Sequence, residues 1–433
     1  MVGTLLAHRL LAALAGLALA LGLSACGGGG GGSGPGSKRL DLVIGNSLPL
    51  RGISKQLGES GRKASDLAVK QITRAIGETG ADHTVRIVNE SQGSDATSAA
   101  RSAQKLVADD HASCLTGPWS ADAVLQTAKD VAIPAKVLEI APVSTSQEVA
   151  DLNDHDLVNS TALPDSLEGS ALAKAIEQDL GGAQGHTVNV AAGNDSYGDT
   201  LTKDFTQSWQ GEDGTVGSQV VLAPPAYSSQ AAQITSGSPD AVVVIDSLDG
   251  FTLLAPALSS SPSWDPSEAW GGDQLVSPGL PARVGSSAVQ GMRALAAGMP
   301  RGEEATSAFV GAFKSASPHG VKLAPFAAQE FDATVLCYLA AVAAGSTDGQ
   351  RMADKLVDIT APGGETFSWQ QLPAAIKALE DGKDIDYTGA SGPIDMDVHG
   401  DPTTGVFEVW RFTSSGLQAG GEVSASKPNP AAN

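Results

Sequence analysis

The stretch DAVVVI, residues 240–245, sets five apolar residues in a row, three of them valines. A short continuous apolar run rich in β-branched residues is typical of a strand buried within a sheet. Shorter strands of the same kind alternate with helical stripes along much of the chain. This alternation predicts a parallel sheet with helices on both of its faces.

The first part of the folded chain shows the alternation clearly. An apolar run at 41–45 is followed by Ala64, Leu67, Ala68 and Ile72, which recur at helical spacing. The next segments repeat this order. We expect strands at 41–45, 85–88, 113–117 and 137–141, and helices at 60–76, about 99–107 and 120–131.

The same order restarts after about residue 160, and the carboxyl-terminal part departs from it with a long alanine-rich helix. Two successive sheets of this kind predict two α/β lobes. We expect helices at 166–180, 198–210 and 326–344, and strands at 188–191, 220–222, 240–245, 394–397 and 406–410.

The first 37 residues have a different composition. His8 and Arg9 precede an apolar run of about fourteen residues, fewer than the roughly twenty that span a membrane. We interpret residues 1–25 as a secretory signal peptide. The sequence Leu23-Ser24-Ala25-Cys26 resembles the lipobox of bacterial lipoproteins, which implies lipidation of Cys26 and makes the glycine-rich residues 26–37 a flexible tether. The alternative is an ordinary cleavage site with a chance cysteine.

The composition limits what the folded part binds. The chain has 433 residues, of which 42% are hydrophobic, and a formal net charge of −21. So acidic a chain is not expected to bind nucleic acid through its phosphates. No Cys/His cluster has metal-ligand spacing, so we expect no metal or other cofactor. Cys114 and Cys337 either pair in an oxidising exported compartment or remain two buried free thiols.

Six short motifs, in order, resemble those of the leucine/isoleucine/valine-binding protein family. They are Ile44-Gly45-Asn46-Ser47-Leu48-Pro49-Leu50-Arg51-Gly52, Gly117-Pro118-Trp119-Ser120, Ala141-Pro142-Val143-Ser144-Thr145, Asn194-Asp195-Ser196-Tyr197-Gly198, Glu330-Phe331-Asp332-Ala333 and Tyr387-Thr388-Gly389-Ala390-Ser391-Gly392-Pro393-Ile394-Asp395. That family consists of solute-binding proteins of ABC importers with the type I periplasmic-binding-protein fold. The resemblance implies an α/β fold of two doubly wound, Rossmann-like lobes joined by three crossovers. We expect lobe 1 at 38–160 plus 293–392, lobe 2 at 161–292 plus 393–425, and a disordered tail at 426–433.

In doubly wound sheets, ligands bind beyond the carboxyl ends of the strands. Ser120 follows one expected strand and precedes a helix, where its other role is that of an N-cap. A shift of one residue in the alignment would put Ala121 at this position. Trp119, just before Ser120, is expected to form a wall of the ligand pocket, and its alternative is packing in the core. By resemblance, Val143 offers a carbonyl to an α-ammonium and Thr145 offers a hydroxyl and an N–H to a carboxylate. The stretch Val143-Ser144-Thr145 is otherwise a plain turn.

In lobe 2 the resemblance selects Tyr197, which either faces the ligand or packs at a helix start. Asp246 and Ser247 end the strand at 240–245, and such residues either reach the ligand or cap the next helix. Asp273 stands where amino-acid-binding relatives carry an acid that pairs with the ligand's ammonium. Its alternative is an ordinary loop aspartate.

The resemblance implies a monomeric, extracytoplasmic solute-binding lipoprotein, held on the outer face of the cell membrane through Cys26, that delivers a small polar solute to an ABC permease. The solute stays open between a branched-chain amino acid, another amino acid, an amide and a urea-like compound, because Leu57, Arg51 and Lys55 depart from the family pattern. Ligand sensing for a membrane receptor or kinase is the alternative. An exported hydrolase is disfavoured because neither Gly-x-Ser-x-Gly nor His-Glu-x-x-His occurs, so we expect no enzyme.

Overall fold

The computed structural model describes residues 38–427 except 53, 94, 278, 317–319 and 415. The expected signal peptide, Cys26 and the tether lie outside the described residues. The expected tail begins too early at 426, because Ser426 ends a strand and the Lys427 backbone N–H donates to the Thr403 carbonyl (2.8 Å). Within the described part, none of the helices combines the length and the apolar character needed to span a bilayer.

Lobe 1 is built on a five-stranded sheet in the order β2-β1-β3-β4-β5, with all strands parallel. Along β1, Leu42 and Ile44 face one hydrophobic cluster while Val43 faces another, so the sheet is covered on both sides. The strands are β1 (Leu40–Leu48), β2 (His83–Ser91), β3 (Cys114–Thr116), β4 (Leu138–Ala141) and β5 (Val158–Ser160).

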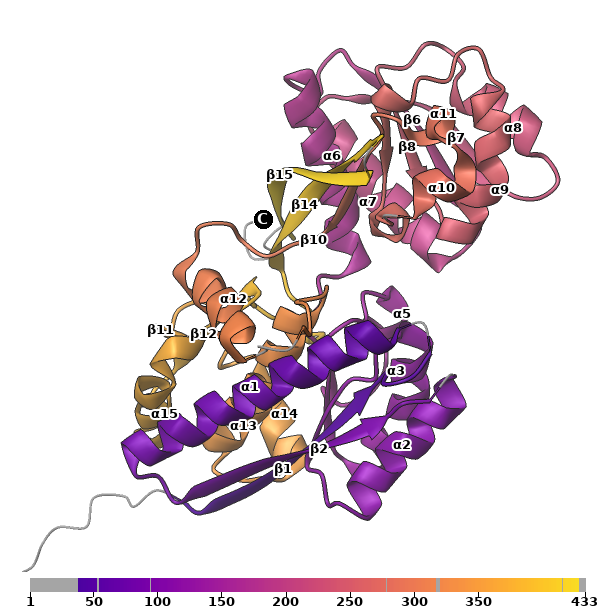
Figure 1. Ribbon diagram of the computed structural model, residues 1–433. Coiled ribbons are helices and arrows are strands. Elements are labelled where there is room, and N and C mark those ends of the chain that lie inside the picture. Colours follow the sequence, from indigo (N-terminus) through magenta and orange to yellow (C-terminus); the bar gives the residue numbers. More distant parts are fainter. Residues whose placement is uncertain are drawn as a thin grey trace, which may run out of the picture. The chain divides into compact units, whose positions relative to one another are not determined.

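The helices of lobe 1 divide between the two faces of this sheet (Figure 1). One face packs against α1 (Lys55–Thr79), α12 (Glu304–Ala316), α13 (Ala327–Ala344), α14 (Gly349–Leu356) and α15 (Leu372–Glu380). The other face packs against α2 (Ala96–Ala108) and α3 (Ala121–Thr127), which continues as the π-helical turn η1 (Ala128–Ala132). Short helices α4 (Ile133–Ala135) and α5 (Gln147–Ala150) complete this side.

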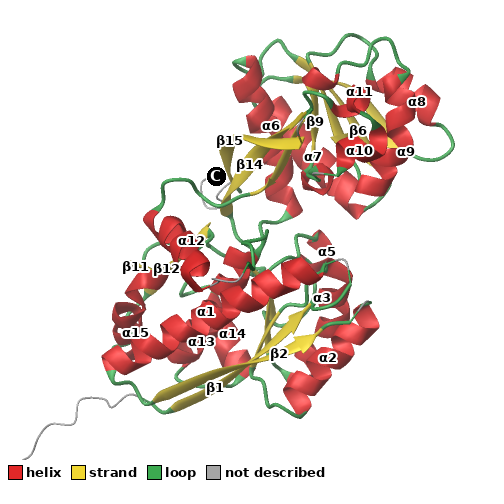
Figure 2. Ribbon diagram, viewed as in Figure 1, coloured by secondary structure: helices red, strands yellow, loops and turns green. Residues whose placement is uncertain are grey.

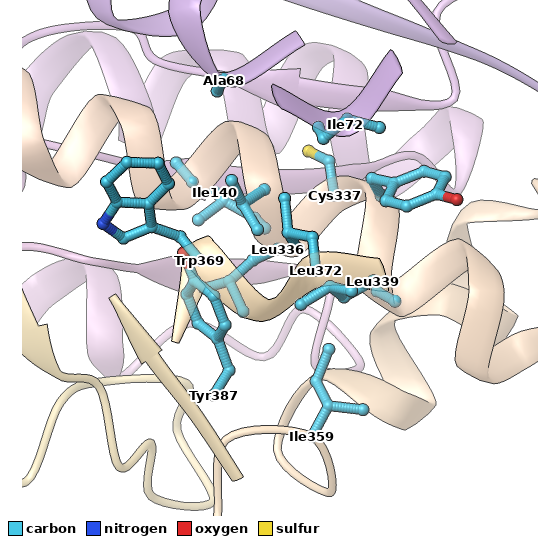
Figure 3. Packing of buried hydrophobic residues seen from close by; sticks show 14 of the residues in the cluster. Ala68, Ile72, Ile140, Leu336, Cys337, Leu339, Ile359, Trp369, Leu372 and Tyr387 are labelled. Carbon is cyan, nitrogen blue, oxygen red and sulfur yellow. The ribbon is translucent and has the colours of Figure 1, made fainter. Parts of the chain in front are cut away.

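Helix α13 is the centre of the lobe 1 core. Every residue from Ala327 to Val342 is buried, including two acids, Glu330 and Asp332. Figure 3 shows its side chains Leu336, Cys337 and Leu339 among residues of α1, β4 and the segments after α14. A small sheet covers this region, made of β11 (Glu365–Ser368), β12 (Ile385–Gly389) and β13 (Gly392–Pro393), with the turn η4 (Trp369–Gln371) after β11.

A disulfide between Cys114 and Cys337 joins β3 to α13, with the two Cα atoms 6.0 Å apart. Both cysteines are fully buried in the lobe 1 core. Of the two states that the sequence left open, the structure therefore contains the disulfide.

Lobe 2 is built on a seven-stranded sheet in the order β15-β14-β10-β9-β8-β6-β7. Figure 2 shows the paired strands β14 and β15 beside helix α6. Five strands are parallel, and β14 and β15 join the sheet antiparallel beyond β10. They are β6 (Thr187–Gly193), β7 (Thr215–Leu222), β8 (Ala241–Ile245), β9 (Ala269–Gly271), β10 (Arg293–Ala297), β14 (Thr404–Thr413) and β15 (Gly416–Ser426).

The second sheet is also covered on both faces. Helices α6 (Asp165–Leu180) and α7 (Ser196–Gly211) share one hydrophobic cluster with it. The opposite cluster contains residues of α8 (Tyr227–Ile234), α9 (Leu248–Ser259), α10 (Leu280–Val284) and α11 (Ser286–Val289). The turns η2 (Pro266–Glu268) and η3 (Asp273–Leu275) flank β9.

The predicted α/β fold with parallel sheets is confirmed, and two details of the prediction are wrong. Strand β10 was expected in lobe 1, but it pairs with β9 and β14 in the lobe 2 sheet, so the boundary lies beyond Ala297. Residues 394–397 were expected to form a strand, but only an isolated bridge joins Met396 to Pro402. The chain passes between the two sheets after β5, after β10 and after β13.

Candidate functional site

In lobe 1, three neighbouring strands bring the expected residues to one edge. The strand register pairs Asn46 of β1 with Thr116 of β3, and Thr116 with Ile140 of β4. The chain leaves β3 through Trp119 and Ser120 and leaves β4 through 142–145. The carboxyl ends of these strands therefore place the two expected segments at the same edge of the sheet.

Ser120 is the N-cap of α3, with extended backbone (φ −168°, ψ 152°), and its side chain makes no capping hydrogen bond. It is exposed, and Ala121 begins the helix. An N-cap serine usually satisfies one of the first helical N–H groups with its own hydroxyl. Here that hydroxyl and the free N–H groups of the first turn remain available to a polar ligand.

The segment after β4 is held by side chains rather than by regular structure. Ser160 donates its hydroxyl to the Ser144 carbonyl (2.9 Å), and the Asp165 N–H donates to the Thr145 carbonyl (2.9 Å). Val143 and Thr145 are half-buried. The Ser144 hydroxyl is buried and has no hydrogen-bond partner among the described residues. This segment is thus a fixed turn that still carries an unsatisfied polar group.

Beneath this edge lies a buried acid that the sequence did not single out as a site residue. Thr116 donates its hydroxyl to Glu330 Oε1 (3.0 Å), and burial raises the pKa of Glu330 to about 8. Trp119 and Asn46 also approach this carboxyl, yet Trp119 Nε1, Asn46 Oδ1 and Glu330 Oε2 form no hydrogen bond of good geometry. With a pKa of about 8, Glu330 is mainly protonated at neutral pH, so it supports the floor of the site without a charge.

Trp119 itself is largely buried. A side chain at Gly61 of α1 would come within 2.2 Å of the indole ring, so the glycine is what lets the ring pack against α1. The backbone N–H of Trp119 donates to Gln92 Oε1 (2.9 Å). The ring therefore fixes the loop that carries Ser120.

In lobe 2, β6, β8 and β9 are neighbours, and their carboxyl ends bring the other expected residues together. The register pairs Ala192 with Ile245 and Val244 with Gly271. Tyr197 lies in the first turn of α7 after β6, Asp246 follows β8, and Asp273 follows β9.

Tyr197 and Asp273 are in direct contact. The Tyr197 hydroxyl donates to Asp273 Oδ1 (2.9 Å) and lies 3.3 Å from Glu168 Oε1. Glu168 Oε1 also accepts the Asp273 N–H at 2.6 Å. Burial raises the pKa of both carboxyls, and the charge of Asp273 raises that of Glu168 further.

Two further acids adjoin this pair. Asp165, in the first turn of α6, is 6% exposed, and burial raises its pKa to about 7 while a hydrogen bond from Thr145 opposes the rise. Burial raises the pKa of Asp246 to about 6, and its Oδ1 accepts the Ser247 N–H (2.8 Å). The Ser247 hydroxyl accepts the Gly250 N–H (3.0 Å), so this serine acts as the N-cap of α9, one of its two expected roles.

Sequence reasoning missed Glu168 and Asp165. An acid in the first turn of a helix usually complements the helix dipole at the surface, and Asp165 and Glu168 have that pattern. Their burial depends on the neighbouring strands and on the close approach of Gly272, where a side chain would come within 2.2 Å of the Tyr197 hydroxyl. The Trp270-Gly271-Gly272 sequence before Asp273 was the available signal.

Three comparisons with known proteins bear on the site. A model of the periplasmic binding protein family matches residues 41–403. The chain belongs to the periplasmic binding protein family. The family and the fold are those of ligand-binding proteins.

A curated relative is the chemotactic signal transduction system substrate-binding protein BasB of Halobacterium salinarum, 26% identical over 400 residues, covering 87% of this chain and 88% of the relative. Among solved structures, the leucine-binding protein LivK of Thermotoga maritima is 20% identical with a TM-score of 0.61, covering 90% of this chain and 99% of that chain. LivJ of Streptococcus pneumoniae, in complex with isoleucine, is 16% identical with a TM-score of 0.63, covering 89% and 100%. A solute-binding protein of R. palustris in complex with 4-hydroxybenzoate is 15% identical with a TM-score of 0.65, covering 90% and 99%. These structures share the type I periplasmic-binding-protein fold with this chain.

Proposed function

We propose that the protein is the solute-binding component of an ABC importer, which captures a small polar solute between its lobes and passes it to a membrane permease. The observation that carries the proposal is that each lobe gathers polar groups at the carboxyl ends of its strands. In lobe 1 these are Ser120 with its free hydroxyl and the turn at 143–145, and in lobe 2 they are Tyr197 and Asp273 in direct contact. Family membership supports the same role.

The mechanism follows from how these groups are arranged. The solute first meets the N–H and hydroxyl groups of lobe 1 at Ser120 and Thr145, with the Val143 carbonyl available to a donor. Lobe 2 then closes and adds Tyr197, Asp246 and Asp273, as in hinge closure around a ligand. A solute that contacts both lobes stabilises the closed state because it binds that state better than the open one. The closed, liganded form then docks on the permease.

A sensory role is the second candidate. The specific observation in its favour is the relative BasB, whose name places it in a chemotactic signal transduction system. In that case the closed, liganded form would contact a membrane receptor or kinase instead of a permease. The solute site would be the same in both roles.

We also propose that the protein is anchored on the outer face of the cell membrane. The support is the lipobox-like sequence at 23–26 and the glycine-rich segment after it. Acyl chains on Cys26 would hold the protein at the membrane, since each buried CH₂ contributes about 0.8 kcal/mol. Metabolic labelling with a fatty-acid analogue tests this proposal: wild type should be labelled and Cys26→Ala should not. Equal labelling of both would overturn it.

A binding screen tests the solute-binding function itself. Purified protein is heated with amino acids, amides, urea, aromatic acids and amines, one at a time, and a specific ligand should raise the melting temperature because it binds only the folded state. The bound compound is then recovered and analysed. Recovery of the unchanged compound supports capture, whereas conversion to a product would contradict it.

The variant Asp273→Asn tests the lobe 2 contact. If a ligand ammonium pairs with this carboxylate, the variant should bind at least tenfold more weakly by calorimetry, because a charged hydrogen bond contributes about 1.5–3 kcal/mol. The matched control is Glu212→Gln, which removes an exposed acid at the far end of α7. Equal affinity of Asp273→Asn and wild type would remove Asp273 from the site.

A further inference from the structure

The lobe 2 side of the candidate site is built from acids that come from separate elements. The Tyr197 hydroxyl lies within hydrogen-bond distance of both Glu168 and Asp273, and Glu168 also accepts the Asp273 backbone N–H. Asp165 lies three residues before Glu168 on α6, so their side chains share one face of the helix. Asp246 follows β8, and its carboxyl lies near Gly193 at the end of β6.

Asp165, Glu168 and Asp246 are buried, Asp273 is half-buried, and one of the buried acids is incompletely bonded. Glu168 is 3% exposed and Asp246 is 7% exposed. Asp165, although only 6% exposed, has an Oδ1 without a hydrogen-bond partner in the described part of the chain. A buried carboxyl oxygen without a donor is costly, and a ligand that donates a hydrogen bond to it removes that cost.

No cation of the described chain balances these acids. The charges that act on Asp165, Glu168 and Asp246 come from other acids, which include Asp195 and Asp401. Of the acids named here, only Asp401 has nearby cationic side chains, Lys427 and His399, that oppose the rise of its pKa. Lys427 also forms an ion pair with Asp397 at 2.7 Å. When these acids ionise, the balancing positive charge must therefore come from outside the described chain.

We propose that the solute of this protein carries a net positive charge, and that its amino or guanidino group enters the acidic cluster of Asp165, Glu168, Asp246 and Asp273. This inference rests on the proposed solute-binding function and names the class of solute. A neutral amino acid brings its own carboxylate and neutralises only one of these acids, whereas a basic amino acid or a diamine supplies the missing charge and several N–H donors.

A metal ion is a weaker fit than an organic cation. In residues 38–427, with their short gaps, no group of three or more Asp, Glu, His or Cys side chains is arranged to hold a metal ion. Tyr197 within the cluster offers a flat apolar face next to the carboxylates, which suits an alkylammonium or guanidinium group.

Matched pairs of ligands test the charge. Lysine is compared with norleucine, which lacks only the second amino group, and benzamidine with benzoate, which has a similar shape and the opposite charge. At constant ionic strength and pH 7.5, the cationic member of at least one pair should raise the melting temperature and bind at least tenfold more tightly by calorimetry. Calcium and magnesium are run alongside, and a response to them alone overturns the inference in favour of a metal.

The pH dependence gives an independent readout. Binding of a cation ionises acids that hold protons in the free protein, so calorimetry in two buffers of different ionisation enthalpy should show proton release. Because the pKa of Asp165 is about 7 and that of Asp246 about 6, affinity should rise between pH 6 and pH 8. The other titratable groups that face these acids are Tyr197, Asp195 and Asp401, with His399 and Lys427 beside Asp401.

Two single variants complete the test. Asp165→Asn and Asp246→Asn lie on different elements, and each should weaken the cation at least tenfold, while Glu212→Gln should not. Either variant suffices if the other fails to fold in a melting experiment. Tighter binding of norleucine or benzoate than of the matching cation overturns the inference and leaves solute binding intact. No binding by compounds of any charge contradicts both proposals.

Discussion

At the scale of single residues, two buried acids of α13 show how the surroundings decide protonation. Asp332 accepts hydrogen bonds from the Tyr387 hydroxyl, the Ala390 N–H, and the N–H and hydroxyl of Ser391, at 2.6–3.0 Å. Its pKa is raised by burial, but these donors limit the rise to about 6. Glu330 has one such donor from a side chain of good geometry, Thr116, and its pKa is about 8. At pH 7, Asp332 is therefore mainly ionised and Glu330 mainly neutral.

This difference predicts opposite outcomes for two amide substitutions. Glu330→Gln replaces a neutral acid by a neutral amide and should change the free energy of unfolding by less than about 1 kcal/mol at pH 7. Asp332→Asn turns an NH₂ group toward several hydrogen-bond donors. It should lower the free energy of unfolding by about 3 kcal/mol, because these buried donors lose their acceptor. Urea denaturation of both variants at pH 7 measures the two effects. Equal losses would show that the two acids do not differ in protonation.

The sequence alone located part of the site because strand ends are visible as the ends of apolar runs. Ser120, Tyr197, Asp246 and Asp273 lie at such ends, and whether they contact a solute stays a prediction. Glu330 could not be predicted as a site residue from a strand end, because it lies inside the alanine-rich helix α13. Its position beneath the site becomes visible only when the strands are packed around that helix.

At the scale of elements, the long helix at 326–344 was predictable from its composition, and the strand predicted at 406–410 is part of β14, whereas β15 was not predicted. A buried parallel strand such as β8 has a continuous apolar run, whereas β15 alternates small and polar residues with little burial. The strand β10 was assigned to the wrong lobe because its sequence, Arg293–Ala297, does not specify which sheet it joins. The parallel pairing of β10 with β9 places β10 in the lobe 2 sheet.

The disulfide between β3 and α13 links elements that are 223 residues apart in sequence. Cross-linking distant segments restricts the unfolded chain, and removing a native disulfide costs about 2–5 kcal/mol. We expect the double variant Cys114→Ala/Cys337→Ala to lower the urea midpoint by a corresponding amount. Wild-type protein treated with a reductant after partial unfolding should fall to the same value, and an unchanged midpoint in the double variant would mean that the bridge adds no stability.

At the scale of the whole molecule, both lobes contain buried acids whose pKa is raised. Burial raises the pKa of Glu330 to about 8, of Asp165 to about 7, and of Asp332, Asp246 and Asp401 to about 6. The folded protein therefore binds protons more tightly at these sites than the unfolded chain does. Their contribution to stability is complete below about pH 4 and is lost as the pH rises through 6 to 8.

The free energy of unfolding of the ligand-free protein should consequently decrease from pH 5 to pH 9, which urea denaturation at one-unit steps can measure. The chain carries a net charge of −21, and its self-repulsion acts in the same direction, so the series is repeated in about 0.5 M salt, which screens surface charges. A decrease that persists in salt belongs to the buried acids. Glu330→Gln should flatten the part of the curve between pH 7 and pH 9, since it removes the group with the highest raised pKa of the five. A stability that rises with pH over this range would mean that the buried carboxyls are ionised at little cost, as they would be if donors or cations reached them in solution.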